Sequence, residues 1–137
     1  MLTCRTTLFD NNNQPVELPG YRADACTDAA IRFVAEKAAS EEPFFLFLSF
    51  IEPHHQNRTD DYPAPDGYRE RYTTRPWLPP DLLELEGNQH QSLPGYWGMI
   101  KRLDECLGRL QDGLKSLGLL DDTIMIQTCD HVRPVPS

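Results

Sequence analysis

Histidines and one carboxylate stand at two places where this 137-residue chain could do chemistry. His54 and His55 come two residues after one apolar run, and Asp130-His131 comes one residue after another. A carboxylate supplies negative charge to a hard divalent cation, and an imidazole can pass a proton near neutral pH to an anionic oxygen or a leaving group. These residue types indicate a metal held by Asp130 and His131 and an anion held by His54. Surface loop histidines and a strand-end cap are the alternative, because spacing in sequence does not establish proximity in space.

Two apolar runs must position these residues. Residues 44–51, FFLFLSFI, lie between Pro43 and Pro53, and this short run predicts a strand that is buried on both faces of a parallel sheet. A buried helix is the weaker alternative, since eight residues is short for one. Residues 123–128, TIMIQT, predict a second buried strand. Ligands of open α/β sheets bind beyond the carboxyl ends of the strands, so neighbouring parallel strands would bring both groups to one edge.

Helices are predicted between and before these strands. Apolar residues at three- and four-residue spacing predict an amphipathic helix from about Thr27 to Ser40. A longer apolar stripe predicts a helix from about Trp97 to Leu117, with Pro94 near its start and Gly118 just past its end. The stripe suits packing on a sheet, and a coiled-coil face is the alternative. The order of elements along the chain is a strand, a crossover that contains a helix, and a second strand. This order predicts an α/β fold with mainly parallel strands flanked by helices.

The other segments are rich in turn-forming residues. The first part of the chain, through Arg22, reads as an extended piece with turns at residues 11–13 and 19–20. Residues 52–91 contain six prolines and are too long for a plain connection in a compact domain, which predicts a functional or a disordered segment. Its tyrosines and Trp77 favour an ordered surface cover, with a short helix at about residues 80–85.

The composition of the chain limits the classes of partner and site that it can have. The 13 basic and 21 acidic residues give a net charge of -8, which suits cations and argues against nucleic acid. No run approaches the roughly 18 to 20 apolar residues of a membrane span, and the first residues lack the apolar core of a signal peptide, so the compartment stays unassigned. Cysteines at 4, 26, 106 and 129 form no C-x-x-C pair, which predicts ordinary thiols and leaves a disulfide open.

Several short blocks in a fixed order resemble the sulfatase family of the alkaline-phosphatase-like superfamily, over about residues 20–131. The blocks are residues 43–50, Pro53-His54, Gly95-Tyr96, Leu103-Asp104, residues 108–110, residues 117–119, residues 122–124 and Asp130-His131. The resemblance implies a mixed sheet between helices and hydrolysis of sulfate esters at a formylglycine, which is made from Cys or Ser in a C/S-x-P/A-x-R motif. It also implies a divalent cation, usually calcium, and a sulfated small molecule or carbohydrate as substrate.

The resemblance assigns roles to three residues. The family's later metal-binding pair maps onto Asp130 and His131. Its Pro-His after the aromatic strand maps onto Pro53-His54, and this imidazole would touch the sulfate or help to protonate the leaving oxygen. His55 receives no role. Complete relatives are often exported, but this chain carries no signal of its own.

The formylglycine motif is absent from this chain. Cys129 has Arg133 at the fourth place but His131 where Pro or Ala belongs, and Ser92 has Pro94 but Tyr96 where Arg belongs. The family's paired aspartates and basic residues that precede this region are missing as well, and Val132 replaces the usual Gly. We therefore expect a single incomplete sulfatase catalytic domain, with a core of about residues 20–131 and an atypical tail at 132–137, that is inactive alone. A fragment of a metal-dependent phosphodiesterase or phosphomutase of the same superfamily, or a non-catalytic truncated module, is the alternative.

Overall fold

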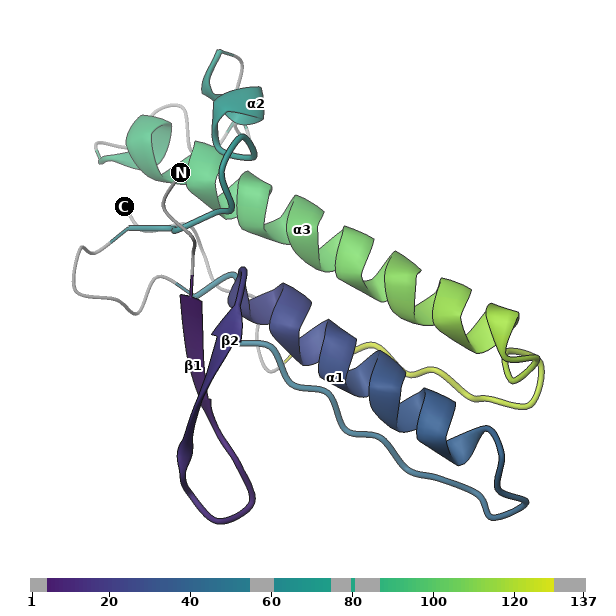
Figure 1. Ribbon diagram of the computed structural model, residues 1–137. Coiled ribbons are helices and arrows are strands. Elements are labelled where there is room, and N and C mark those ends of the chain that lie inside the picture. Colours follow the sequence, from purple (N-terminus) through teal and green to yellow (C-terminus); the bar gives the residue numbers. More distant parts are fainter. Residues whose placement is uncertain (1–4, 55–60, 75–79, 81–86, 130–137) are drawn as a thin grey trace. The chain divides into compact units, whose positions relative to one another are not determined.

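The computed structural model describes residues 5–54, 61–74, 80 and 87–129. Its elements, in chain order (Figure 1), are β1 (Arg5–Phe9), β2 (Pro15–Pro19), α1 (Arg22–Lys37), α2 (Glu70–Thr73) and α3 (Gln89–Ser116). The chain divides into two compact units, the first of Met1–Phe50 with Asp104–Thr123 and the second of Ile51–Leu103 with Ile124–Ser137. The backbone of α3 passes from the second unit into the first. Among the described helices, none has the length and apolar character that a bilayer span requires.

A β-hairpin opens the first unit. β1 and β2 pair antiparallel, with Arg5 opposite Pro19 and Phe9 opposite Pro15. The Asp10 carboxylate closes the turn by accepting the backbone N–H groups of Asn12 at 2.9 Å and Gln14 at 2.8 Å. This confirms the turn predicted at residues 11–13, although the hairpin itself was not predicted.

α1 is confirmed as a helix, but it begins at Arg22 rather than near Thr27. Thr27 is fully buried inside the helix, where its hydroxyl donates to the carbonyl oxygen of Ala23 at 2.7 Å. A threonine at the predicted start of a helix can satisfy the free N–H groups of the first turn. In the structure the Thr27 hydroxyl bonds to the preceding turn instead, so the predicted start at about Thr27 was wrong.

The core of the first unit forms between α1 and the C-terminal half of α3. Ala30 and Val34 of α1 are buried against Leu110 and Leu114 of α3. These residues recur at helical spacing on each element, so each helix turns one apolar stripe toward the other. The C-terminal half of the predicted stripe of α3 is therefore a packing face, but it packs against α1 and not on the sheet that was predicted.

α3 ends just before Gly118, as the sequence predicted. Gly118 has φ of +70°, which glycine adopts without the steric cost that other residues meet. The N–H of Gly118 donates to the carbonyl of Lys115 at 3.1 Å, and the N–H of Leu119 donates to that of Leu114 at 2.9 Å. This pair of bonds is a Schellman motif, and Leu119 adds the apolar contact that often accompanies it.

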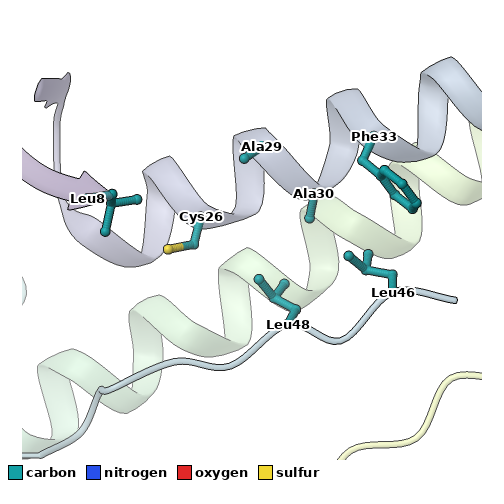
Figure 2. Close-up of a pocket in the computed structure, with 7 residues that line it drawn as sticks. All are labelled: Leu8, Cys26, Ala29, Ala30, Phe33, Leu46 and Leu48. Atoms are coloured by element: carbon teal, nitrogen blue, oxygen red, sulfur yellow. The ribbon is translucent and has the colours of Figure 1, made fainter. Parts of the chain in front are cut away.

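The predicted strand at residues 44–51 is not a strand in this structure. Its side chains alternate between half-buried and exposed, and Phe45 and Phe47 are 85% and 79% exposed. Leu46 and Leu48 on the other face turn toward α1 (Figure 2). Burial of both faces is not observed in the described part of the chain, because the described residues supply no further layer over the second face.

The predicted strand at residues 123–128 is likewise unpaired in the described part of the chain. Ile124 and Ile126 are 89% and 84% exposed. A strand is defined by hydrogen bonds to a neighbour, so an apolar run without a neighbour stays unassigned. The one sheet within the described ranges is the antiparallel hairpin, and a parallel sheet is not observed there.

Candidate functional site

His54 lies in a turn just after the apolar segment. Its backbone N–H donates to the carbonyl oxygen of Ile51 at 3.0 Å, and its side chain is half-buried. Glu52 in the same turn is only 6% exposed, and the Glu52–Pro53 peptide bond is cis. The backbone of this turn therefore places the His54 side chain just beyond the end of the apolar segment.

The other predicted site residues, His55, Asp130 and His131, lie outside the described residues. The predicted meeting of His54 with the Asp130-His131 pair therefore stays a prediction. In the ranges that the structure does describe, His, Cys, Asp and Glu side chains form no group of three or more placed to hold a metal ion. The short helix predicted at about residues 80–85 falls almost entirely outside the described ranges too.

The loop of residues 61–74 is an ordered part of the second unit, as the aromatic residues of this stretch predicted. Arg69 holds it in place, because its guanidinium donates to the Asp61 carboxylate at 2.5 Å and to the carbonyl oxygen of Gln91 at 2.7 Å. The hydrogen bond from Arg69 lowers the pKa of Asp61 below its ordinary value, and the backbone N–H of Tyr62 at 2.8 Å acts in the same direction. Partial burial opposes this shift but does not reverse it.

The loop also packs closely on the N-terminal half of α3. A Cβ at Gly98 would come within 2.8 Å of the Ala64 side chain and 3.1 Å of the Tyr68 backbone. Tyr62, which is only 5% exposed, meets Tyr96 edge to face with ring centroids 5.6 Å apart. Such contacts leave the loop little freedom to shift, so it is a fixed surface rather than a loose connection.

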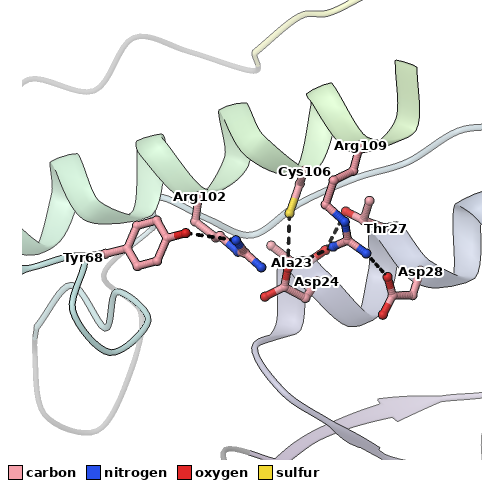
Figure 3. Close-up of polar contacts among 8 residues, drawn as sticks. All are labelled: Ala23, Asp24, Thr27, Asp28, Tyr68, Arg102, Cys106 and Arg109. Carbon is pink, nitrogen blue, oxygen red and sulfur yellow. Dashed lines mark hydrogen bonds and ion pairs between the residues drawn. The ribbon is translucent and has the colours of Figure 1, made fainter. Parts of the chain in front are cut away.

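Two guanidinium groups lie against one ring of this loop. Arg71 lies 4.7 Å and Arg102 5.6 Å from the centroid of Tyr68, and Arg102 also donates to the Tyr68 hydroxyl at 2.9 Å (Figure 3). The ring face attracts both cations. The sequence analysis missed this group. The signal that could have found it is the recurrence of arginines among tyrosines in residues 68–72.

A second polar group fastens α1 to α3 within the first unit. The Arg109 guanidinium donates to the Asp24 carboxylate at 3.1 Å and also to the Asp28 carboxylate (Figure 3). The Sγ of buried Cys106 lies 3.7 Å from the same Asp24 oxygen. Cys26, Cys106 and Cys129 form no disulfide bond, which agrees with the prediction of ordinary thiols. The Arg109 guanidinium lies between two carboxylates of α1, so the visible role of this group is to hold two helices together.

A family model and two curated relatives point to one family. The family model described as Sulfatase matches residues 3–136. The chain is 30% identical over 125 residues to the uncharacterized sulfatase YdeN of Escherichia coli (strain K12), a match that covers 91% of this chain and 19% of the relative. It is 27% identical over 126 residues to the ulvan-active sulfatase of Formosa agariphila, covering 90% of this chain and 24% of that protein.

The fold has a counterpart among solved structures. The crystal structure of yidJ from Bacteroides fragilis aligns with a TM-score of 0.65 at 20% identity, over 85% of this chain and 27% of that one. This likeness shows that the two chains share a fold over the aligned segment. The chain spans about a fifth to a quarter of the length of the YdeN and Formosa relatives. With the family match extending over residues 3–136, the chain belongs to the sulfatase family.

Proposed function

We propose that this chain is part of the catalytic domain of a sulfuric ester hydrolase and supplies residues to both the sulfate side and the metal side of its site. The observation that carries the proposal is the extent of the family match, which includes His54, Asp130 and His131 in one continuous region. The substrate class that follows is a sulfate ester of a small molecule or a carbohydrate.

His54 is the residue proposed to act on the sulfate group. It follows the apolar segment directly, and the bond from its N–H to Ile51 fixes the direction in which the chain leaves that segment. An imidazole placed there can donate a hydrogen bond to a sulfate oxygen or a proton to the departing alkoxide. Both actions stabilise negative charge that develops as the ester bond breaks.

Asp130 and His131 are the residues proposed to hold a divalent cation. The Asp130 carboxylate suits calcium, which takes oxygen ligands, whereas the His131 imidazole suits a softer metal. When bound, the cation would neutralise negative charge on the sulfate oxygens. We therefore name a divalent cation, with calcium as the first to be tested.

The nucleophile must come from sequence beyond these residues. No Cys or Ser in the chain has Pro or Ala two places on together with Arg four places on, so a formylglycine cannot be made here by the family's motif. Nucleophile and metal act as one unit in such catalysis, and the chain alone is expected to turn over no ester.

The proposal also includes the arrangement of two strands in the complete domain. Residues 44–51 and 123–128 are proposed to be strands of a mainly parallel sheet in the complete domain. Their support is their exposed apolar side chains, Phe45, Phe47, Ile124 and Ile126 among them, which leave apolar surface in water. A sheet that covers these faces would bring the ends of both strands, and with them His54 and Asp130, to one edge.

Calorimetric titration of the chain with calcium, and separately with manganese, tests the metal assignment. Saturable binding that Asp130→Asn abolishes is the expected result, and manganese binding that depends on His131 would change the preferred metal. Asp112→Asn is the matched control, because it removes an exposed carboxylate from α3. Binding unaffected by Asp130→Asn would refute the ligand assignment.

A chimera tests the reaction. This chain would replace the matching segment of the ulvan-active sulfatase, and release of sulfate and of phosphate from aryl esters would be measured. We expect sulfate release that His54→Ala reduces without loss of folding. Phosphate release alone would favour a phosphate-ester enzyme of the same superfamily.

A further inference from the structure

Two cationic side chains gather around one aromatic ring of the loop of residues 61–74, within the second unit. The guanidinium carbon of Arg71 lies 4.7 Å and that of Arg102 lies 5.6 Å from the centroid of the Tyr68 ring. Arg102 reaches the ring from α3 and donates to its hydroxyl oxygen at 2.9 Å (Figure 3). These three residues, the Tyr68 group, therefore form a locally positive surface on a chain whose net charge is -8.

The two arginines that the loop itself carries differ in what they contact. Arg69 donates to the Asp61 carboxylate and to the carbonyl oxygen of Gln91, so its charge is used to hold the loop on α3. Arg71, two residues on, is exposed. Among the residues that the structure describes, the Arg71 guanidinium lies on the Tyr68 ring and forms no ion pair with a carboxylate. The charge of Arg71 is therefore available to a ligand.

The ring that positions both cations is itself fixed. A Cβ at Gly98 of α3 would come 3.1 Å from the Tyr68 backbone, which shows how closely the loop lies on the helix. The contacts of Arg69 anchor the residue next to Tyr68 in the chain. The ring face and the hydroxyl then hold the two guanidinium groups. A side chain that is already held loses less rotamer freedom on binding, so the Tyr68 group is prepared for a ligand.

The chemistry of the Tyr68 group selects a compact oxyanion. A guanidinium presents parallel N–H donors that fit two oxygens of one carboxylate or sulfate group. Asp66 and Glu70 are exposed carboxylates of the same loop, and they would repel a long polyanion such as nucleic acid. A single acidic group on an otherwise neutral ring avoids most of that repulsion.

We propose that Tyr68, Arg71 and Arg102 form a subsite for a second acidic group, a sulfate or a carboxylate, on the sugar that carries the sulfate ester. The proposal rests on the proposed function, in which His54 of the same unit acts on the ester sulfate. It narrows the substrate class to acidic carbohydrates with at least two negative groups, because such sugars repeat acidic groups along one molecule. Arg71 and Arg102 are then residues that determine specificity.

Calorimetric titration of the 137-residue chain at low ionic strength tests the subsite. The probe is a sulfated disaccharide of glucuronate and N-acetylgalactosamine, and its desulfated methyl ester is the neutral control probe. We expect the sulfated disaccharide to bind, Arg71→Met to weaken its affinity by about tenfold or more, and the neutral probe not to bind. Arg32→Met is the matched control, because it removes the same charge from an exposed position of α1 and should leave the affinity unchanged.

Tyr68→Phe separates the placement of the cations from their charge. The variant keeps the ring beside Arg71 but removes the hydroxyl that accepts the hydrogen bond from Arg102. Its affinity for the sulfated disaccharide should fall by about threefold, although no charge has been removed. Circular dichroism of each variant shows whether α3 is intact, so that a loss of binding is not mistaken for a loss of folding.

Four results would overturn the proposal. One is that the sulfated disaccharide does not bind. Another is an equal loss of affinity in Arg71→Met and Arg32→Met, since net charge alone would then explain binding. Equal affinity for inorganic sulfate and for the disaccharide would make the Tyr68 group a general anion site. A DNA oligonucleotide that binds more tightly than the disaccharide, and that Arg71→Met releases, would assign the surface to nucleic acid.

The test is independent of the tests of the proposed function. The titration needs neither a metal nor turnover, so a failed calcium titration or an inactive chimera would leave a positive result standing. Conversely, a chain that does not bind the disaccharide would leave the roles proposed for His54, Asp130 and His131 unchanged.

Discussion

Gly95 of α3 lies against Tyr62 so closely that a side-chain carbon at Gly95 would come 2.3 Å from the Tyr62 carbonyl oxygen. Carbon and oxygen do not approach to that distance without a shift of one backbone. The Gly95-Tyr96 block of the family resemblance therefore has a local physical reason in this chain. Glycine there lets the loop that carries Arg69 pack directly on the helix.

Gly95→Ala should destabilise the second unit. Overpacking of a close contact typically costs about 1–3 kcal/mol, which exceeds the gain of roughly 0.5–1 kcal/mol when Ala replaces Gly in a helix. Gly108→Ala is the matched control, because Gly108 lies in α3 with nothing within 4 Å of its added carbon. Urea unfolding followed by circular dichroism should show a lower midpoint for the first variant and a higher one for the second. The reverse order would mean that the contact with Tyr62 is not maintained.

Arg109 should contribute to stability through its shape as well as its charge. Its planar guanidinium reaches both Asp24 and Asp28, and a lysine ammonium cannot reproduce that fork. Because the Arg109 side chain is 39% exposed, we expect Arg109→Met to lower the free energy of unfolding by only about 1 kcal/mol. The stability of Arg109→Lys should lie between that of the unsubstituted chain and that of Arg109→Met. Arg32→Met, at an exposed position of α1, should have little effect. An equal loss for both Met variants would show that net charge alone matters.

Asp61 should make the loop sensitive to acid. Its pKa is lowered in the folded chain by the hydrogen bond from Arg69, so the carboxylate favours the folded state above the ordinary pKa of aspartate. That contribution is lost as the pH falls below about 4 and through the lowered value. Asp61→Asn should reduce stability near neutral pH and make stability fall less steeply in acid. Asp66→Asn is the control, because it removes an exposed carboxylate of the same loop. An unchanged acid slope in Asp61→Asn, measured by urea unfolding at several pH values, would contradict the pairing.

Gly118 should be sensitive to any side chain that resists positive φ. Gly118→Ala should cost about 1 kcal/mol of stability because alanine is strained at φ of +70°. Gly118→Asn should cost less, since asparagine tolerates that region. Thermal unfolding of the three forms should rank them glycine, asparagine, alanine. A different order would mean that α3 does not end in the Schellman motif.

The sequence predicted the helices better than the strands. α3 was predictable because its apolar stripe and Gly118 are local signals, but it begins at Gln89 rather than near Trp97, and Pro94 lies inside it instead of marking its start. The start of α1 was misplaced because Thr27 has two possible partners, and only packing decides which it uses. Residues 44–51 show the limit most clearly: their period-two exposure is visible in the structure, but within the described ranges they pair with no strand.

The candidate site was predictable in part for a related reason. His54 could be placed after an apolar run from sequence order alone, and the structure puts it in a turn there. Whether it meets Asp130 and His131 depends on contacts between segments far apart in the chain. The Tyr68 group was missed because its members, Arg71 and Arg102, come together only when the loop packs on α3.

The first unit is built from segments that lie far apart in the sequence, and this affects how it folds during synthesis. Its core joins α1 to α3, and the contacts of Arg109 with Asp24 and Asp28 span 85 and 81 residues of sequence. During synthesis α1 must leave the ribosome well before its partner helix exists. Until residues 104–123 have been translated, the apolar stripe of α1 therefore lacks the cover that Leu110 and Leu114 give it, and it is more open to other nascent chains.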